Sequence, residues 1–290
     1  MRTALFAAMA LLGFAANSLL CRLALRAGEI DAASFTAIRL ASGALVLALL
    51  VVTRGARLRG AGNWTSAIAL GAYAVMFSIA YRELSAGTGA LLLFGAVQLT
   101  MIAGALRSGE RPTALQCAGW FVAAAGLVVL TAPGIDPPPP FEAALMLGAG
   151  VAWGVYTLRG RIAGDALMAT TGNFVRTLPF AIILAIVALA SDAHLTVAGV
   201  ALAAASGGIA SGIGYSLWYA AVPGLGATRA ATIQLAVPVL TAIAGIALLG
   251  ESLRIALAIG GSAIVLGLAL ALVRAPTGRA REPRVLDVPR

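Results

Sequence analysis

Long apolar runs follow one another along almost the whole chain, and they restrict its fold more than any other feature. Of the 290 residues, 61% are hydrophobic and 11% are charged, whereas soluble domains carry about 25% charged residues. A helix that crosses the ~30 Å hydrocarbon core of a bilayer needs about 20 apolar residues. The sequence therefore predicts an all-α membrane protein and leaves little length for a water-soluble catalytic domain.

Charged residues, glycines and prolines separate the runs and predict ten transmembrane helices. We expect these helices at roughly 3–25, 32–53, 64–84, 87–107, 112–131, 142–160, 167–190, 197–220, 228–249 and 253–273. Four successive prolines, Pro137 to Pro140, follow the fifth helix and predict a stiff aqueous linker. Pro179 and Pro238 lie within predicted helices and are expected to kink them.

The two halves of the chain resemble each other. Short motifs of the first half recur 141 residues later: Leu99-Thr100 as Leu240-Thr241, Gly109-Glu110 as Gly250-Glu251, Gly119 as Gly260 and Gly126 as Gly267. Because each half holds five helices, an odd number, the second half must enter the membrane from the opposite side. Inverted repeats around a central cavity are typical of transporters. We predict a first five-helix repeat at 3–131, a Pro-rich linker at 132–140, a second, inverted repeat at 141–273 and a basic, disordered tail at 274–290.

Every basic residue is an arginine, and the distribution of the arginines predicts the topology. Fourteen lie in segments on one side of the predicted membrane and four in segments on the other. Since positive residues are enriched on the cytoplasmic side, we expect a bacterial inner-membrane protein with both termini in the cytoplasm. Binding to nucleic acid would need a basic stripe on a soluble surface. No nucleic acid and no obligate protein partner is expected.

The acidic residues lie at predicted helix ends, in loops or in the tail, and the single histidine, His194, lies in a loop. The membrane interior therefore offers no carboxylate or imidazole to relay protons. It also offers no metal-ligand cluster and no nucleophile beside a base. We expect a protein that is not an enzyme, that needs no metal or other cofactor and that moves its substrate without proton coupling.

Two arginines, Arg39 and Arg176, lie inside apolar runs at matching positions of the two halves. At 1.5 Å per residue they are roughly 10–13 Å deep in the membrane. In one interpretation they bind substrate carboxylates or gate the two sides. In the other they satisfy carbonyl groups at broken helix ends or extend outward to the interface. The second interpretation is favoured, because a buried ion usually needs fixed protein partners.

Few polar groups and many aromatic rings lie within the predicted helices. The polar side chains, which could bind substrate or a neighbouring helix, are Asn17, Ser78, Gln98 and Gln234. Rings near mid-membrane favour an aromatic cavity, whereas Trp64, Trp218 and Tyr219, near predicted helix ends, favour an interfacial belt. The small residues between Ser206 and Gly214 are expected to let helices approach closely.

Together these features resemble the EamA family of the drug/metabolite transporter superfamily. The resemblance rests on the five-plus-five repeat, on Gly109-Glu110 and Gly250-Glu251, on Arg39 and Arg176, and on Ala152-Trp153-Gly154. It implies ten helices around a central cavity, and within the family the chain is most similar to bacterial exporters of aromatic amino acids. The side chains that it implies for substrate binding are Asn17, Tyr73, Phe77, Tyr81, Phe94, Gln98, Trp153, Tyr156, Tyr215, Trp218 and Gln234.

The resemblance implies export of aromatic and other neutral amino acids, and related metabolites, by alternating access. Relatives with four helices per subunit use a glutamate in the first helix for proton-coupled drug efflux, and the first predicted helix here has none. Two alternatives stay open. One is efflux of lipophilic cations, since aromatic rings also bind cations. The other is a membrane scaffold without transport, against which the internal repeat argues.

Overall fold

The computed structural model describes residues 2–56, 60–107, 113–131, 138–161, 163–191, 193–234, 236–252 and 255–272. These residues are mostly helical and form no β-strand. In chain order the helices are α1 (Arg2–Arg26), α2 (Ala32–Thr53), α3 (Trp64–Ala80), α4 (Ala86–Arg107), α5 (Ala114–Thr131), α6 (Pro140–Gly160), α7 (Ala166–Arg176), α8 (Leu178–Ala190), α9 (Val197–Ala205), the π-helix η1 (Ser206–Ile213), α10 (Gly214–Gln234), α11 (Ala236–Leu249) and α12 (Ile255–Leu272). The predicted tail at 274–290 and most of the predicted linker lie outside the described residues.

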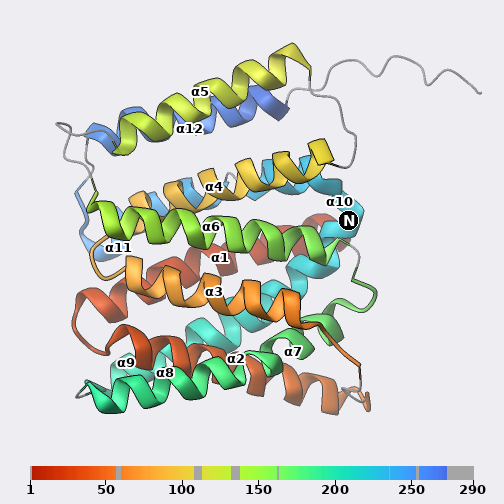
Figure 1. Cartoon of the computed structure of the whole chain (residues 1–290), viewed down its shortest axis with the longest axis vertical. Coiled ribbons are helices and arrows are strands. Elements are labelled where there is room, and N and C mark those ends of the chain that lie inside the picture. Colours follow the sequence, from red (N-terminus) through yellow and green to blue (C-terminus); the bar gives the residue numbers. More distant parts are fainter. Residues whose placement is uncertain are drawn as a thin grey trace, which may run out of the picture.

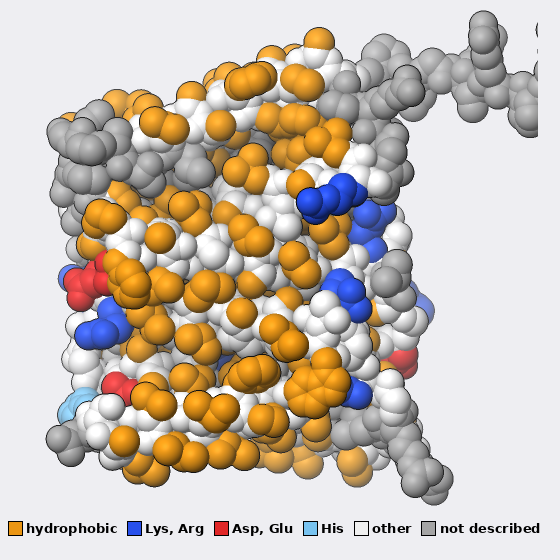
Figure 2. Space-filling view, in the orientation of Figure 1, with side chains coloured by type: hydrophobic (Ala, Val, Ile, Leu, Met, Phe, Trp, Pro, Cys, Tyr) orange, Lys and Arg blue, Asp and Glu red, His pale blue; other side chains and the backbone are white. Residues whose placement is uncertain are grey.

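Apolar helices make up the membrane-facing part of the molecule. In the described part of the chain, six helical stretches are long and apolar enough to cross a bilayer, at Arg2–Arg26, Ala32–Thr53, Ala86–Gly104, Pro140–Gly160, Ala166–Ala190 and Val197–Leu225. Shorter apolar helices lie at Trp64–Ala80, Ala114–Gly126, Ala236–Leu249 and Leu257–Gly267. Figure 2 shows apolar side chains across the middle of the visible face and charged side chains towards its two edges. The protein is therefore a multi-pass helical membrane protein, and the count of ten spans stays a prediction.

Polar residues at predicted helix ends act as caps. Asp31 precedes α2 and accepts a hydrogen bond from the backbone N–H of Ser34 at 2.8 Å, and Asp165 precedes α7 and accepts one from Met168 at 2.9 Å. Each cap satisfies an N–H that the first turn of a helix leaves unpaired. These two carboxylates thus stabilise the first turns of α2 and α7.

The helices α1 and α6 run in opposite directions. Arg22, near the end of α1, donates to the carbonyl oxygen of Tyr81, which directly follows α3, at 3.0 Å. Arg159, near the end of α6, donates to Ser66 and to Asn63, at the start of α3, both at 3.0 Å. Because the last turns of α1 and α6 lie at opposite ends of α3, the two helices are antiparallel.

The helices α5 and α12 pack against each other at one end of the bundle (Figure 1). They approach closely at glycines that also mark the sequence repeat. A Cβ on Gly126 would lie 2.7 Å from the carbonyl oxygen of Gly260, and a Cβ on Gly267 would lie 2.5 Å from that of Gly119. Since Gly260 and Gly267 are the counterparts of Gly119 and Gly126, the two contacts are reciprocal. Reciprocal contacts are those that a two-fold axis produces.

The predicted helix at 167–190 is two helices in the structure. The chain leaves α7 at Thr177 and begins α8 at Leu178, so that Pro179 lies in the first turn of α8. A proline is tolerated in a first turn because its missing N–H would have no partner there, whereas inside a helix it removes a hydrogen bond. The expected kink is therefore a break between two helices.

The predicted helices at 197–220 and 228–249 also have different limits. The first comprises α9, η1 and the start of α10, and α10 continues to Gln234 through Pro223. The loop predicted between the two helices was wrong, because membrane helices tolerate glycine and proline where neighbouring groups satisfy the freed carbonyls. Pro238 is the third residue of α11, where its missing N–H breaks no hydrogen bond within the helix.

Candidate substrate-binding site

Asn17 lies at the centre of a buried polar cluster. Its side-chain amide on α1 donates to the hydroxyl of Tyr73 on α3 at 3.1 Å. Its Oδ1 accepts hydrogen bonds from Ser206 at 2.7 Å and from Ser211 at 3.2 Å, both on η1. All four side chains are buried. Asn17 thus connects α1 to α3 and to a helix of the second half.

The π-helical turns of η1 are the reason why two serines reach one amide. Ser206 and Ser211 are five residues apart, and in an α-helix they would point about 140° away from each other. A π-helix forms hydrogen bonds between residues five apart, so both serines lie on the face that meets Asn17. The sequence contains a row of small residues here and gives no sign of this wider helix.

Arg39 on α2 joins the same cluster. Its Nε donates to Ser211 at 3.1 Å, and its Nη2 donates to the hydroxyls of Tyr215 at 2.8 Å and Tyr73 at 3.2 Å. Its guanidinium carbon lies 5.1 Å from the ring centre of Tyr73 and 4.9 Å from that of Phe77, distances at which a cation interacts with a ring face. The side chain is 1% exposed, and its Nη1 has no hydrogen-bond partner among the described residues.

Arg176, the counterpart of Arg39 in the second half, has a different environment. It is partly buried, and its Nη1 donates to the backbone carbonyl oxygens of Ala61 and Gly172, the latter at 2.9 Å. Hydrogen bonds to carbonyl groups are what the second interpretation of the two arginines predicted. That interpretation describes Arg176 and does not describe Arg39, whose hydrogen bonds all go to hydroxyl groups.

Aromatic rings extend the cluster from Arg39 towards α6 and α10. The ring of Trp153 on α6 lies 4.5 Å from that of Tyr215 and 5.1 Å from that of Tyr73, measured between ring centres. Its indole N–H donates to Oε1 of Gln234 at 3.1 Å, and Nε2 of Gln234 contacts the sulfur of Met101 at 3.6 Å. Trp153 therefore links the polar group around Asn17 to the one around Gln234.

A second set of rings continues from Trp153 along α6 and α10. Tyr156 lies 5.4 Å from Trp153 and stacks on Tyr219 at 4.7 Å, and the hydroxyl of Tyr219 donates to the carbonyl oxygen of Tyr156 at 2.9 Å. The interfacial belt predicted for Trp218 and Tyr219 was wrong, because both side chains are buried against other rings inside the bundle. Trp64, by contrast, is 56% exposed, as a belt residue should be.

All eleven side chains predicted to bind substrate are buried in the structure. Ring contacts or hydrogen bonds join nine of them in one network, in which Phe14 connects Trp218 to Trp153. The nine are Asn17, Tyr73, Phe77, Tyr81, Trp153, Tyr156, Tyr215, Trp218 and Gln234. Phe94 and Gln98 are buried on α4, and among the described residues the ring contacts do not extend to Phe94. Whether these residues bind substrate stays a prediction.

The sequence interpretation missed several members of the network. Phe14 contacts Trp153, Tyr215 and Trp218, with ring centres 5.2 to 5.7 Å apart, and Phe174 contacts Tyr215 at 6.1 Å. Phe14 could have been found, because it lies three residues before Asn17 and so shares its helix face. No signal in the sequence distinguishes Phe174, Ser206 or Ser211 from ordinary packing residues.

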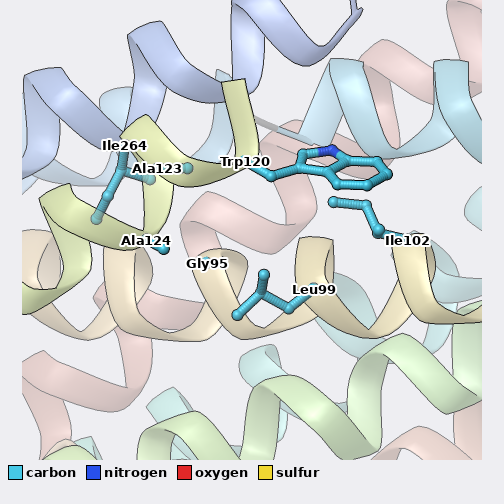
Figure 3. Close-up of a pocket in the computed structure, with 7 residues that line it drawn as sticks. All are labelled: Gly95, Leu99, Ile102, Trp120, Ala123, Ala124 and Ile264. Carbon is cyan, nitrogen blue, oxygen red and sulfur yellow. The ribbon is translucent and has the colours of Figure 1, made fainter. Parts of the chain in front are cut away.

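Two of the pockets lined by described residues share no residue with this network. One is a small apolar pocket between α4, α5 and α12, where Figure 3 shows Ile102 beside the indole of Trp120. The other is an apolar groove between α1 and the segment from α9 to α10, lined by residues such as Leu12, Gly13 and Ile209. The rings and polar groups of the network pack directly on one another.

A multi-pass helical bundle with such a buried network is consistent with a membrane transporter. The profile of the EamA-like transporter family matches residues 1–132 and, separately, residues 140–273. The chain belongs to this family, whose members are transporters of the drug/metabolite type rather than enzymes.

The chain is 49% identical over 282 residues to the uncharacterized protein PA1977 of Pseudomonas aeruginosa, and the match covers 97% of this chain and 98% of that protein. The structure is also similar to a solved structure titled only as the crystal structure of a protein, with a TM-score of 0.64 and 23% sequence identity. That similarity covers 92% of this chain and 98% of the other, and it shows a shared fold.

Proposed function

We propose that this membrane transporter carries amino acids, aromatic and other neutral ones, by alternating access and that it exports them across a bacterial inner membrane. The resemblance noted from the sequence is closest to the bacterial aromatic amino acid exporter YddG, and this closeness is part of the proposal. The observation that carries the proposal is the buried network of aromatic rings around hydrogen-bonded polar groups. Mostly apolar sites with a few placed polar groups are typical of small-molecule binding.

The network favours amino acids over the alternative substrates, lipophilic cations. Ring faces attract cations, and this feature alone would suit a quaternary ammonium compound. The guanidinium of Arg39, however, lies over the rings of Tyr73 and Phe77 and already occupies that position. Its positive charge, buried in a medium of low dielectric constant, repels a second cation strongly. A zwitterion carries a negative group that offsets this repulsion.

Alternating access requires two halves that move relative to each other around the site. In our proposal the halves are inverted repeats, at 3–131 and 141–273, with both termini in the cytoplasm. Support comes from the antiparallel α1 and α6 and from the reciprocal glycine contacts of α5 and α12. Single cysteines introduced as Ala27→Cys and Gly164→Cys, after Cys21 and Cys117 have been replaced, test this. An impermeant thiol reagent should label them from opposite sides, and labelling from the same side would refute the inverted repeat.

Uptake by proteoliposomes tests the substrate class. Purified protein in vesicles should transport labelled phenylalanine, threonine or methionine faster than empty vesicles do, and a pH gradient should not change the rate. Trp153→Ala should abolish the uptake, whereas Trp64→Ala, which alters an exposed tryptophan, should preserve it. Transport of a quaternary ammonium compound without transport of any amino acid would overturn the proposal in favour of drug efflux.

A further inference from the structure

Arg39 is a buried cation that forms no ion pair with any carboxylate of the described residues. The ion pair found among the described residues is between Arg22 and Glu251 and does not involve Arg39. Other described carboxylates are engaged elsewhere: Asp31 and Asp165 cap helices, and Glu29 accepts a hydrogen bond from Thr196. Arginines within membranes usually pair with acids or with backbone carbonyl groups, and Arg39 has hydroxyl groups instead.

The groups around Arg39 have more hydrogen-bond donors than acceptors. The guanidinium can only donate, and the amide of Asn17 and the hydroxyls of Tyr73, Tyr215 and Ser211 all have protons to donate. Asn17 Oδ1 is the acceptor-only atom of this group, and two serines already donate to it. The Nη1 of Arg39 has no hydrogen-bond partner in the part of the chain that the structure describes. A ligand that completes this cluster must accept hydrogen bonds and carry negative charge.

The shape of the site restricts that ligand further. A carboxylate matches the planar fork of a guanidinium and binds it through two parallel hydrogen bonds. The rings of Tyr73 and Phe77 flank the guanidinium, and Tyr73 contacts Trp153. Apolar or aromatic groups attached to the carboxylate would therefore lie against ring faces.

We propose that Arg39 binds the carboxylate of the transported solute, so that the protein requires a carboxylate in its substrates. The hydroxyls of Tyr73 and Tyr215, which now accept from Nη2, then turn to donate to the same carboxylate. This inference deepens the proposed function and rests on it for the identity of the solute. It assigns different roles to the two matched arginines, since Arg176 is held by backbone carbonyl groups.

Binding and uptake with matched ligands and variants test the inference. The ligands are phenylalanine, 3-phenylpropionate, which lacks the amino group, and phenylalaninamide and phenethylamine, which lack the carboxylate. Purified protein should gain thermal stability with the first two and none with the last two. Arg39→Gln should raise the KM for phenylalanine uptake at least tenfold and remove the stabilisation by carboxylates, and Arg39→Lys should recover part of both. Arg176→Gln is the control, because it should change the melting temperature and leave the KM and the choice of ligand unchanged.

The two assays separate the inference from the proposed function. Phenylalanine uptake with an unaltered KM in Arg39→Gln, or equal use of phenylalaninamide by the wild-type protein, would overturn the role of Arg39 and leave amino acid transport standing. Stabilisation by 3-phenylpropionate that depends on Arg39, without uptake of any amino acid, would support the carboxylate site and refute the proposed function. If Arg39→Gln does not fold, the comparison of acid and amide in the wild-type protein decides the question.

Discussion

Replacing Gly207 by alanine should destabilise the protein by about 2 kcal/mol. Gly207 lies on η1 where this helix crosses α2, and a Cβ there would overlap the carbonyl oxygen of Arg39 and lie 2.7 Å from its carbonyl carbon. Ordinary contacts between carbon atoms are about 3.5–4.0 Å, so the helices would have to separate by roughly 1 Å. Overpacking of this kind costs about 1–3 kcal/mol. We take about 3 kcal/mol, the upper end of this range, because the backbone atoms of Arg39 cannot rotate away. The better helix propensity of alanine returns about 1 kcal/mol, which leaves about 2 kcal/mol.

A thermal unfolding scan of purified protein in detergent measures this effect. With a shift of about 2–4 °C per kcal/mol, Gly207→Ala should melt about 4–8 °C below the wild-type protein. Gly214→Ala is the matched control, because the atom nearest to its Cβ would be the Cα of Gly13 at 3.8 Å. That variant should melt at the wild-type temperature or slightly above. A Gly207→Ala protein as stable as the wild type would show that the contact between η1 and α2 is not as close as described.

Two other substitutions test contacts at the edge and at the centre of the bundle. Glu251→Gln removes the charge that pairs with Arg22 at 3.1 Å, where the side chains are 8% and 12% exposed. It should lower the free energy of unfolding by about 3 kcal/mol, because the guanidinium loses its counter-ion in a buried site. The control, Glu83→Gln, changes an exposed position and should have no effect. Equal melting temperatures of the two variants would contradict the prediction. Trp153→Phe keeps a ring but removes the donor to Gln234, and a buried acceptor without a partner costs about 1–3 kcal/mol. Its uptake of phenylalanine should fall with its stability, and a melting temperature as high as that of Trp64→Phe would refute the role of this hydrogen bond.

The sequence predicted the class of the fold because the hydrocarbon core of a bilayer places the same requirement on every helix that crosses it. A helix in a bilayer must satisfy its own backbone groups and expose apolar side chains, so the apolar runs can be read directly from the chain. The sequence also indicated that the acidic residues lie outside the apolar runs, and the structure shows that Asp31 and Asp165 cap helices there. The limits of the helices were less certain. Pro179 lies at a break between two helices, whereas α10 continues through Pro223. The effect of a proline on a helix depends on the groups that pack around it, and these come from parts of the chain that are distant in the sequence.

The candidate site could be predicted only in part, for a related reason. Residues such as Tyr73, Trp153 and Tyr215 were identifiable because aromatic side chains within apolar helices are conspicuous. Ser206 and Ser211 were not, because the π-helical turns of η1 bring them together on Asn17.

The chain by itself determined that the protein is a helical membrane protein with two similar halves, since composition and repeats are properties of the sequence alone. The tertiary structure decided which of two matched arginines is held by backbone carbonyl groups and which is left among hydroxyls and rings. Arg39 and Arg176 are the same residue type at corresponding positions, and no local pattern separates them. The difference between them comes from the helices that pack around each, which are distant in the sequence.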